Sequence, residues 1–97
     1  MISEKLEKIF RNSSERELQL LSRAAAIAAA SLEGVKRDDG NPFMNHVTSV
    51  AEIVASEVGL PLPAVCAVFL HEAFRVERDG IKYLKGEFGD EILNIVE

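Results

Sequence analysis

The sequence predicts an all-α fold, a compact bundle of about five or six helices that forms one domain over residues 1–97. Apolar residues recur every three or four positions along most of the chain, which is the spacing of amphipathic helices. No stretch of useful length alternates apolar and polar residues as a strand does. With 47% hydrophobic and 28% charged residues, the chain has the balance of a packed globular domain rather than a disordered tail.

The first two helices are predicted from their apolar spacing and from the residues that precede them. After Ser3, Leu6 and Ile9 begin a short helix that we expect to end near Asn12 and Ser13. A second helix begins after Ser14, which forms a capping-box pattern with Glu17, and Gly34 is its expected stop. Its apolar stripe consists of Leu18, Leu21, Ala25, Ala28 and Leu32.

The segment 35–42 is charged and contains Gly, Asn and Pro, so we expect an exposed loop. Pro42 suits the first turn of a third helix, which Gly59 and Pro61 would end. One side of this helix is expected to face inward, and it carries His46, Val47, Val50, Ala51, Val54 and Val58.

A fourth helix beginning at Pro63 is expected at the centre of the fold, because residues 64–70 are apolar on every side. Two further helices are predicted, one carrying Ile81, Leu84 and Phe88 and one that Asp90 begins and that still runs at Glu97. Its apolar stripe of Ile92, Ile95 and Val96 is cut off. We therefore expect a fragment of a larger domain, with a partner surface further downstream.

The charge and the cysteine content exclude several classes of protein. A net charge of −5 argues against nucleic-acid binding, which needs clustered Lys and Arg. No apolar run approaches the ~20 residues of a membrane span, and the first residues lack the pattern of a signal peptide. The single cysteine, Cys66, is expected to be a small buried hydrophobe in a reducing, cytoplasmic setting.

His71 and Glu72 follow the apolar run of the fourth helix, where a polar side chain costs free energy unless something pairs with it. A divalent metal ion is one such partner. His46 would lie on the preceding helix, and an antiparallel pair of helices would bring the two imidazoles to the same end. Two imidazoles and a carboxylate suit Zn, Mn or Fe, although most inward-facing histidines are only hydrogen-bonded.

Four motifs, weak singly but in the correct order with near-constant spacing, resemble the hydrolase half of the RelA/SpoT proteins over residues 16–97. They are Arg37-Asp-Asp-Gly-Asn-Pro-Phe-Met-Asn-His46, Val50-Ala-Glu-Ile-Val54, Phe69-Leu-His-Glu72 and Glu87-Phe-Gly89. The resemblance implies a helical HD-type domain that uses manganese to remove the 3′-pyrophosphate of (p)ppGpp. It also implies a downstream synthetase domain that transfers pyrophosphate from ATP to GTP or GDP in the stringent response.

By position in these motifs, His46 and His71 match the family's two histidine ligands, and Glu72 stands where the family has Asp. Arg37 matches the arginine that packs against the guanine base, so a guanine nucleotide is a possible ligand. A solvated loop with local ion pairs is the simpler interpretation of Arg37 and Asp38.

The departures from the family pattern indicate a damaged hydrolytic site. The Glu-Asp pair that orients the attacking water falls at Arg75 and Val76, so no acid remains there to accept a proton. Glu72 is one methylene longer than Asp, Asp38 replaces a basic residue, and the last metal ligand would lie beyond Glu97. We therefore expect no catalytic residues and a structural or regulatory role within a GTP pyrophosphokinase.

Three alternatives accompany this interpretation. Arg75 can pair with Glu72, and this pair is preferred over a bound manganese or other divalent ion. An active metal-dependent (p)ppGpp pyrophosphohydrolase would have to use Glu77 in place of the missing acids. A helical protein-interaction module would bind a partner helix near Ile92 and Val96, with no direct contact to nucleic acid or to a membrane.

Overall fold

The computed structural model describes residues 2–76, 88–89 and 92, and side chains within α4 only up to Ala73. The helices are α1 (Glu4–Ile9), α2 (Glu15–Ser31), α3 (Phe43–Ile53), a π-helical turn η1 (Val54–Val58) and α4 (Leu62–Val76). No strand forms among the described residues, which have only an isolated bridge between Lys36 and Pro42. The predicted all-α class is confirmed, and none of the described helices is long and apolar enough to cross a membrane.

The first two helices begin where the sequence predicts, because each is preceded by a serine that caps it. Ser3 Oγ accepts a hydrogen bond from the Leu6 N–H, and Ser14 and Glu17 form the complete capping box. Ser3 Oγ also donates to Glu52 Oε2 at 2.8 Å. This long-range bond ties the start of the chain to α3.

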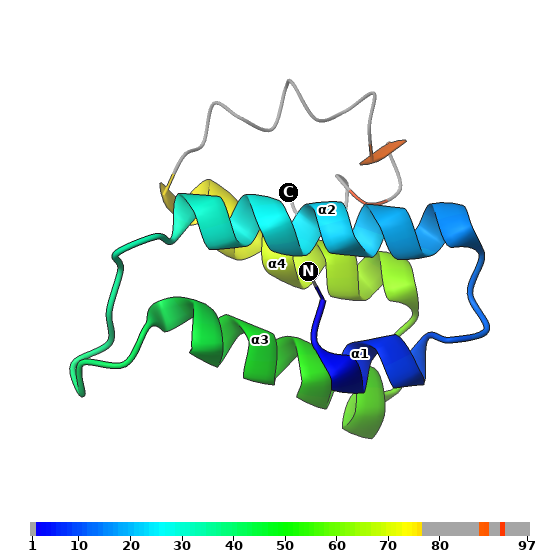
Figure 1. Cartoon of the computed structure of the whole chain (residues 1–97), viewed down its shortest axis with the longest axis horizontal. Helices are drawn as coiled ribbons and strands as arrows, with labels where there is room; N and C mark the ends of the chain where they lie inside the picture. Colours follow the sequence, from blue (N-terminus) through cyan, green and yellow to red (C-terminus); the bar gives the residue numbers. More distant parts are fainter. Residues whose placement is uncertain (1, 77–87, 90–91, 93–97) are drawn as a thin grey trace.

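The core lies mainly between α2 and α4, which pack against each other more extensively than any other pair of described elements (Figure 1). Ala24 and Ala28 of α2 are fully buried, so the alanine-rich stretch lets the two helices approach closely. Cys66 is also fully buried, and burial raises the pKa of its thiol to about 12. The prediction of a small buried hydrophobe at this position is confirmed.

The end of α3 differs from the predicted inward stripe. Val47 and Ala51 are buried as expected, but Val58 is 64% exposed. The cause is η1, whose wider i→i+5 turn rotates the following side chains away from their α-helical positions. Gly59, with φ of +78°, then ends the turn in the left-handed conformation that suits glycine.

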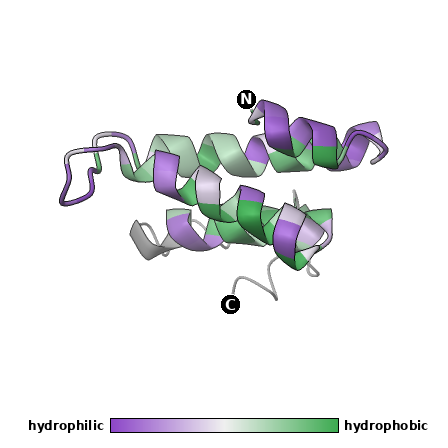
Figure 2. Cartoon of the chain, turned by 90° about the horizontal axis from the view of Figure 1, so that it is seen from below, coloured by the Kyte–Doolittle hydropathy of each residue, from purple (hydrophilic) through white to green (hydrophobic). Residues whose placement is uncertain are grey.

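Helix α4 is mostly hydrophobic, in contrast to the hydrophilic loop between α2 and α3 (Figure 2). It is not surrounded on every side, however. Val65 and Phe69 are buried, whereas Ala64 and Val68 on another face are only half-buried, and His71 on that face is exposed. The expectation that His71 is buried is therefore wrong, because the described residues leave this face of α4 uncovered.

Of the two predicted C-terminal helices, only Phe88, Gly89 and Ile92 are described, and all three are helical. Phe88 and Ile92 are each 4% exposed and belong to the core of the chain itself. Ile92 is thus not part of an unfinished outer surface, which corrects that prediction. Ile95 and Val96 lie outside the described residues.

Candidate functional site

The loop 35–42, predicted to be exposed, folds back on itself through backbone hydrogen bonds. The Arg37 N–H donates to the Asn41 carbonyl at 2.9 Å, and the Gly40 N–H donates to the Arg37 carbonyl at 2.9 Å. Asp39 Oδ1 accepts from the Asn41 N–H at 3.0 Å, and this bond lowers the pKa of the Asp39 carboxyl. The loop therefore holds the backbone of Arg37 in a defined position next to the start of α3.

Arg37 uses this position to contact His46. Its Nη1 lies 3.3 Å from Nδ1 of the ring, and the edge of Phe43 contacts the ring with centroids 5.6 Å apart. A guanidinium can only donate hydrogen bonds, so Nδ1 must be the acceptor, and a neutral His46 carries its proton on Nε2. Arg37, which the family pattern assigns to the guanine base, thus contacts His46, which the same pattern assigns to the metal.

Helices α3 and α4 run antiparallel, so His46 near the start of α3 and His71 near the end of α4 lie at the same end of the pair (Figure 1). Between the helices is a groove of about 340 Å³ with an apolar floor. His71 and Glu72 lie together in its lining, and His46 does not contribute to it. The lining consists of Val50, Leu60, Ala64, Ala67, Val68, His71 and Glu72.

The arrangement of these side chains does not suit a metal ion. Within the described ranges, no group of three His, Cys, Asp or Glu side chains lies close enough to hold one. A histidine ligand normally donates its second ring N–H to an acceptor, but the partner at His46 is Arg37, a cationic donor. A metal at Nδ1 would have to displace Arg37, and a metal at Nε2 would need a proton moved to the nitrogen that Arg37 contacts.

The structure does not bring His46, His71 and Glu72 together as a metal-binding group, and metal binding by these residues stays a prediction. The same holds for the nucleotide role of Arg37. Asp38 is exposed on the loop. The side chains of Arg75 and Val76, and all of Glu77, lie outside the described residues, so the Glu72–Arg75 pair also stays a prediction.

Sequence reasoning missed two features of this site. The Arg37–His46 contact is one, although the turn residues Gly40 to Pro42 between them were a signal that the chain returns toward α3. The second missed feature is the apolar floor of the groove between α3 and α4. Leu60 follows the helix terminator Gly59 and carried no periodic signal, yet it lines the groove and is 39% exposed.

The sequence pattern of the HD domain family matches residues 24–97, which is most of the chain. The chain belongs to the HD domain family. Two relatives also bear out the resemblance to the RelA/SpoT family that the motifs gave. The HD domain is 30% identical over 80 residues to a probable GTP pyrophosphokinase of Mycobacterium leprae, covering 82% of this chain and 10% of that protein.

A second relative is a GTP pyrophosphokinase of Streptomyces coelicolor, also 30% identical over 80 residues, with 82% of this chain and 9% of that protein covered. The HD domain thus spans about a tenth of the length of the relatives it matches. No solved structure is similar enough to this chain to count as a match.

Proposed function

We propose that this HD domain does not hydrolyse (p)ppGpp and serves as a structural or regulatory part of a cytoplasmic GTP pyrophosphokinase of the stringent response. The names of the two relatives support the second half of the proposal. A synthetase domain in the same longer protein would be its natural partner.

The contact between Arg37 and His46 carries the first half of the proposal. At 3.3 Å the guanidinium engages one nitrogen of the imidazole that the family pattern assigns to the metal. A hydrolytic metal centre needs this ring as an electron-pair donor, with an acceptor behind it to fix its orientation. Arg37 supplies a positive charge where such a centre needs an acceptor, so it opposes metal binding both electrostatically and by occupying the ring nitrogen.

The sequence at the end of α4 gives independent support. Positions 75 and 76 hold Arg and Val where the family has two acids, so neither position can supply the general base that the family pattern places there. His71 is exposed, and a nucleophile activated beside it would remain in contact with bulk water. Weak binding of Mn²⁺ and no turnover are the expected behaviour.

The proposal also gives a role to a nucleotide without hydrolysis. The planar guanidinium of Arg37 can stack on a purine base, but it must leave His46 to do so. Nucleotide binding would therefore break the side-chain contact between the loop 35–42 and α3. This is a conformational change that a regulatory domain can transmit to the rest of a longer protein.

The test is a steady-state assay of the full chain with ppGpp and Mn²⁺, with His71→Ala as the matched variant. The expected rates of pyrophosphate release are the same for both proteins and equal to that of Mn²⁺ alone. Hydrolysis by the unaltered chain well above that of His71→Ala would overturn the proposal. Circular dichroism of both proteins confirms that they are folded to the same extent.

A further inference from the structure

The groove between α3 and α4 continues into a larger apolar surface near the end of α3. Val50 lines the groove, and Ile53 follows it by three positions, so the two side chains are neighbours on one side of the helix. Ile53 is 47% exposed, and Leu60 in the groove lining is exposed as well. Of the four large apolar side chains that are exposed among the described residues, three lie in the segment 53–60. Exposed apolar side chains beside a groove are typical of a surface that another protein covers.

This part of the chain carries charge of one sign only. All 11 Lys and Arg residues lie outside the segment 38–74, which contains five of the 16 acidic residues. The rest of the chain therefore has equal numbers of acidic and basic residues. The segment that forms α3, η1 and most of α4 accounts for the whole net charge of −5. Its acidic residues are Asp38, Asp39, Glu52, Glu57 and Glu72.

Two of these acids lie near opposite ends of the groove. Glu57 is exposed and follows Ile53 by four positions, which is one helical turn further along the chain. Glu72 lines the groove beside His71 and already interacts within its own chain. Ala64, at the other end of the lining, lies eight positions before Glu72 on α4, a distance of about 12 Å along the helix axis. Each end of the groove therefore has a carboxylate, and no Lys or Arg lines it.

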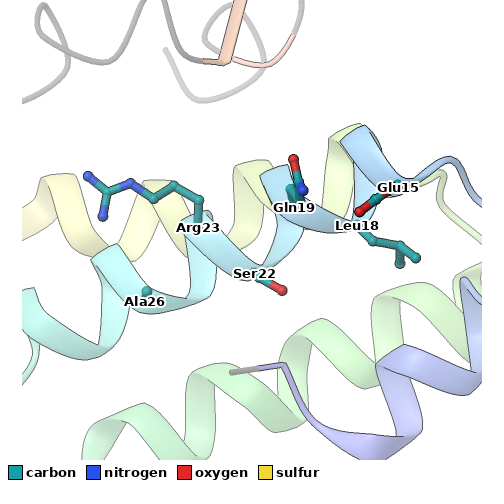
Figure 3. A pocket seen from close by; sticks show the side chains of 6 residues that line it. All are labelled: Glu15, Leu18, Gln19, Ser22, Arg23 and Ala26. Carbon is teal, nitrogen blue, oxygen red and sulfur yellow. The ribbon is translucent and has the colours of Figure 1, made fainter.

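A hollow of about 450 Å³ on α2 differs from the groove in both shape and charge (Figure 3). A single helix lines it, so it has no second wall against which a partner could pack. Its lining carries both Glu15 and Arg23, and its largest apolar side chain, Leu18, is already half-buried. Neither its shape nor its charge favours one kind of partner. The groove between α3 and α4 has two walls, an apolar floor and acids alone at its ends.

We propose that the groove between α3 and α4 binds a basic amphipathic helix of a partner protein. A groove between two helices accepts the apolar side of a third helix, whose anchoring residues are spaced three or four positions apart. Lys or Arg residues at both ends of that apolar side meet Glu57 and Glu72, whereas an acidic helix is repelled. The same negative charge disfavours an anionic membrane or a nucleic acid as the occupant.

The probe for this surface is a helical peptide of about 18 residues, made of Leu and Lys, with its Leu residues on one side of the helix and one Trp among them. Because the chain has no Trp, a shift of the emission to shorter wavelength reports burial of the peptide alone. Titration with the full chain is expected to give a saturable shift. A matched peptide with Glu in place of every Lys is expected to bind roughly tenfold more weakly or less.

Variants of the chain test the apolar and the acidic part of the surface separately. Leu60→Ser and Ile53→Ser remove apolar anchors, and each is expected to weaken binding of the Lys peptide about fivefold or more. Val35→Ser is the matched control, since Val35 is equally exposed but lies outside the groove lining. Glu57→Lys is expected to weaken the Lys peptide roughly tenfold and to strengthen the Glu peptide. Glu33→Lys makes the same change at an exposed position away from the groove and should alter neither.

Circular dichroism of every variant separates loss of binding from loss of helix. Absence of saturable binding by the Lys peptide overturns the proposal, and so does binding that Leu60→Ser and Glu57→Lys both leave unchanged. Self-association of the chain alone that Leu60→Ser abolishes also overturns it, because a second copy would then cover the groove. Neither nucleotide nor metal is present in these titrations, so their result is independent of whether the HD domain hydrolyses (p)ppGpp.

Discussion

The guanidinium of Arg37 lies 3.3 Å from Nδ1 of His46, so a cation from the loop 35–42 contacts the imidazole ring at the start of α3. This contact joins two residues that the family pattern assigns to different ligands, the nucleotide base and the metal. It also fixes which ring nitrogen accepts a hydrogen bond. Under the proposed function, this contact is how the HD domain keeps its two histidines without a working metal centre.

The first prediction concerns the protonation of this ring. In the neutral form of His46, Nε2 is expected to carry the proton and Nδ1 to be the acceptor. Arg37→Ala should then shift the ¹⁵N resonance of His46 Nδ1 and leave both ring nitrogens of His71 unchanged. Lys36→Ala removes a neighbouring cation without touching the contact and should shift neither histidine. A proton found on Nδ1 in the unaltered chain would contradict the geometry.

The second prediction concerns the start of α2. Ser14→Ala removes the side-chain acceptor of the capping box and should lower the free energy of unfolding by about 1 kcal/mol. For a chain of this size that is a drop in Tm of roughly 4–8 °C. Ser13→Ala is the matched control, since only the backbone N–H of Ser13 makes a hydrogen bond at this turn. Equal Tm values for the two variants would show that the cap contributes nothing.

The third prediction tests the close packing of α2 on α4. Ala24 is fully buried, so Ala24→Leu forces extra methylenes into a packed contact and should cost about 1–3 kcal/mol. Ala30→Leu makes the same change at an exposed position of the same helix and should stay within about 0.5 kcal/mol. Urea denaturation of both variants measures the difference. Equal stabilities would mean that the two helices are not in close contact at Ala24.

The fourth prediction is a pH dependence that arises from Cys66. Its pKa is raised by burial to about 12 in the folded chain, against 9.0 for an unperturbed thiol. Below pH 9 both states keep the proton and stability is unaffected. Between pH 9 and 12 only the unfolded state loses it, so stability should fall as pH rises, by up to about 1.4 kcal/mol per pH unit.

Cys66→Val keeps an apolar side chain at this position and removes the ionisable group. The unfolding free energies of the two proteins should run parallel below pH 9 and diverge above it, with the unaltered chain losing more. Parallel curves up to pH 11 would indicate that the thiol is accessible to water in the folded state.

The sequence predicted correctly those features that depend on residues close together in the chain, and it missed those that depend on packing. The helix starts at Ser3 and Ser14 depend on residues three positions apart, and both were correct. The exposed Val58 was missed because the π-helical turn that rotates it depends on how α3 packs, which periodicity does not encode. The helical spacing of apolar residues still predicted correctly that Val47 and Ala51 are buried.

The site was harder to predict because its contacts depend on how the loop and the helices pack in three dimensions. The apolar run before His71 indicated burial, but burial depends on which face of α4 a neighbour covers, and no single-helix pattern carries that information. The bond from Ser3 to Glu52 likewise spans 49 positions. The motifs identified the family correctly, since they depend on residue types in order rather than on three-dimensional contacts.

The proposal that this HD domain does not hydrolyse (p)ppGpp is tested most directly by a single-turnover assay. The chain is in large excess over ppGpp, and Mn²⁺ is saturating. Under these conditions even very slow hydrolysis consumes the nucleotide, so a weak enzyme and a non-enzyme are clearly separated. We expect ppGpp to disappear no faster than with Mn²⁺ alone. Faster consumption that His46→Ala or His71→Ala abolishes would show that the two imidazoles form a working metal centre and would contradict the proposed lack of hydrolysis.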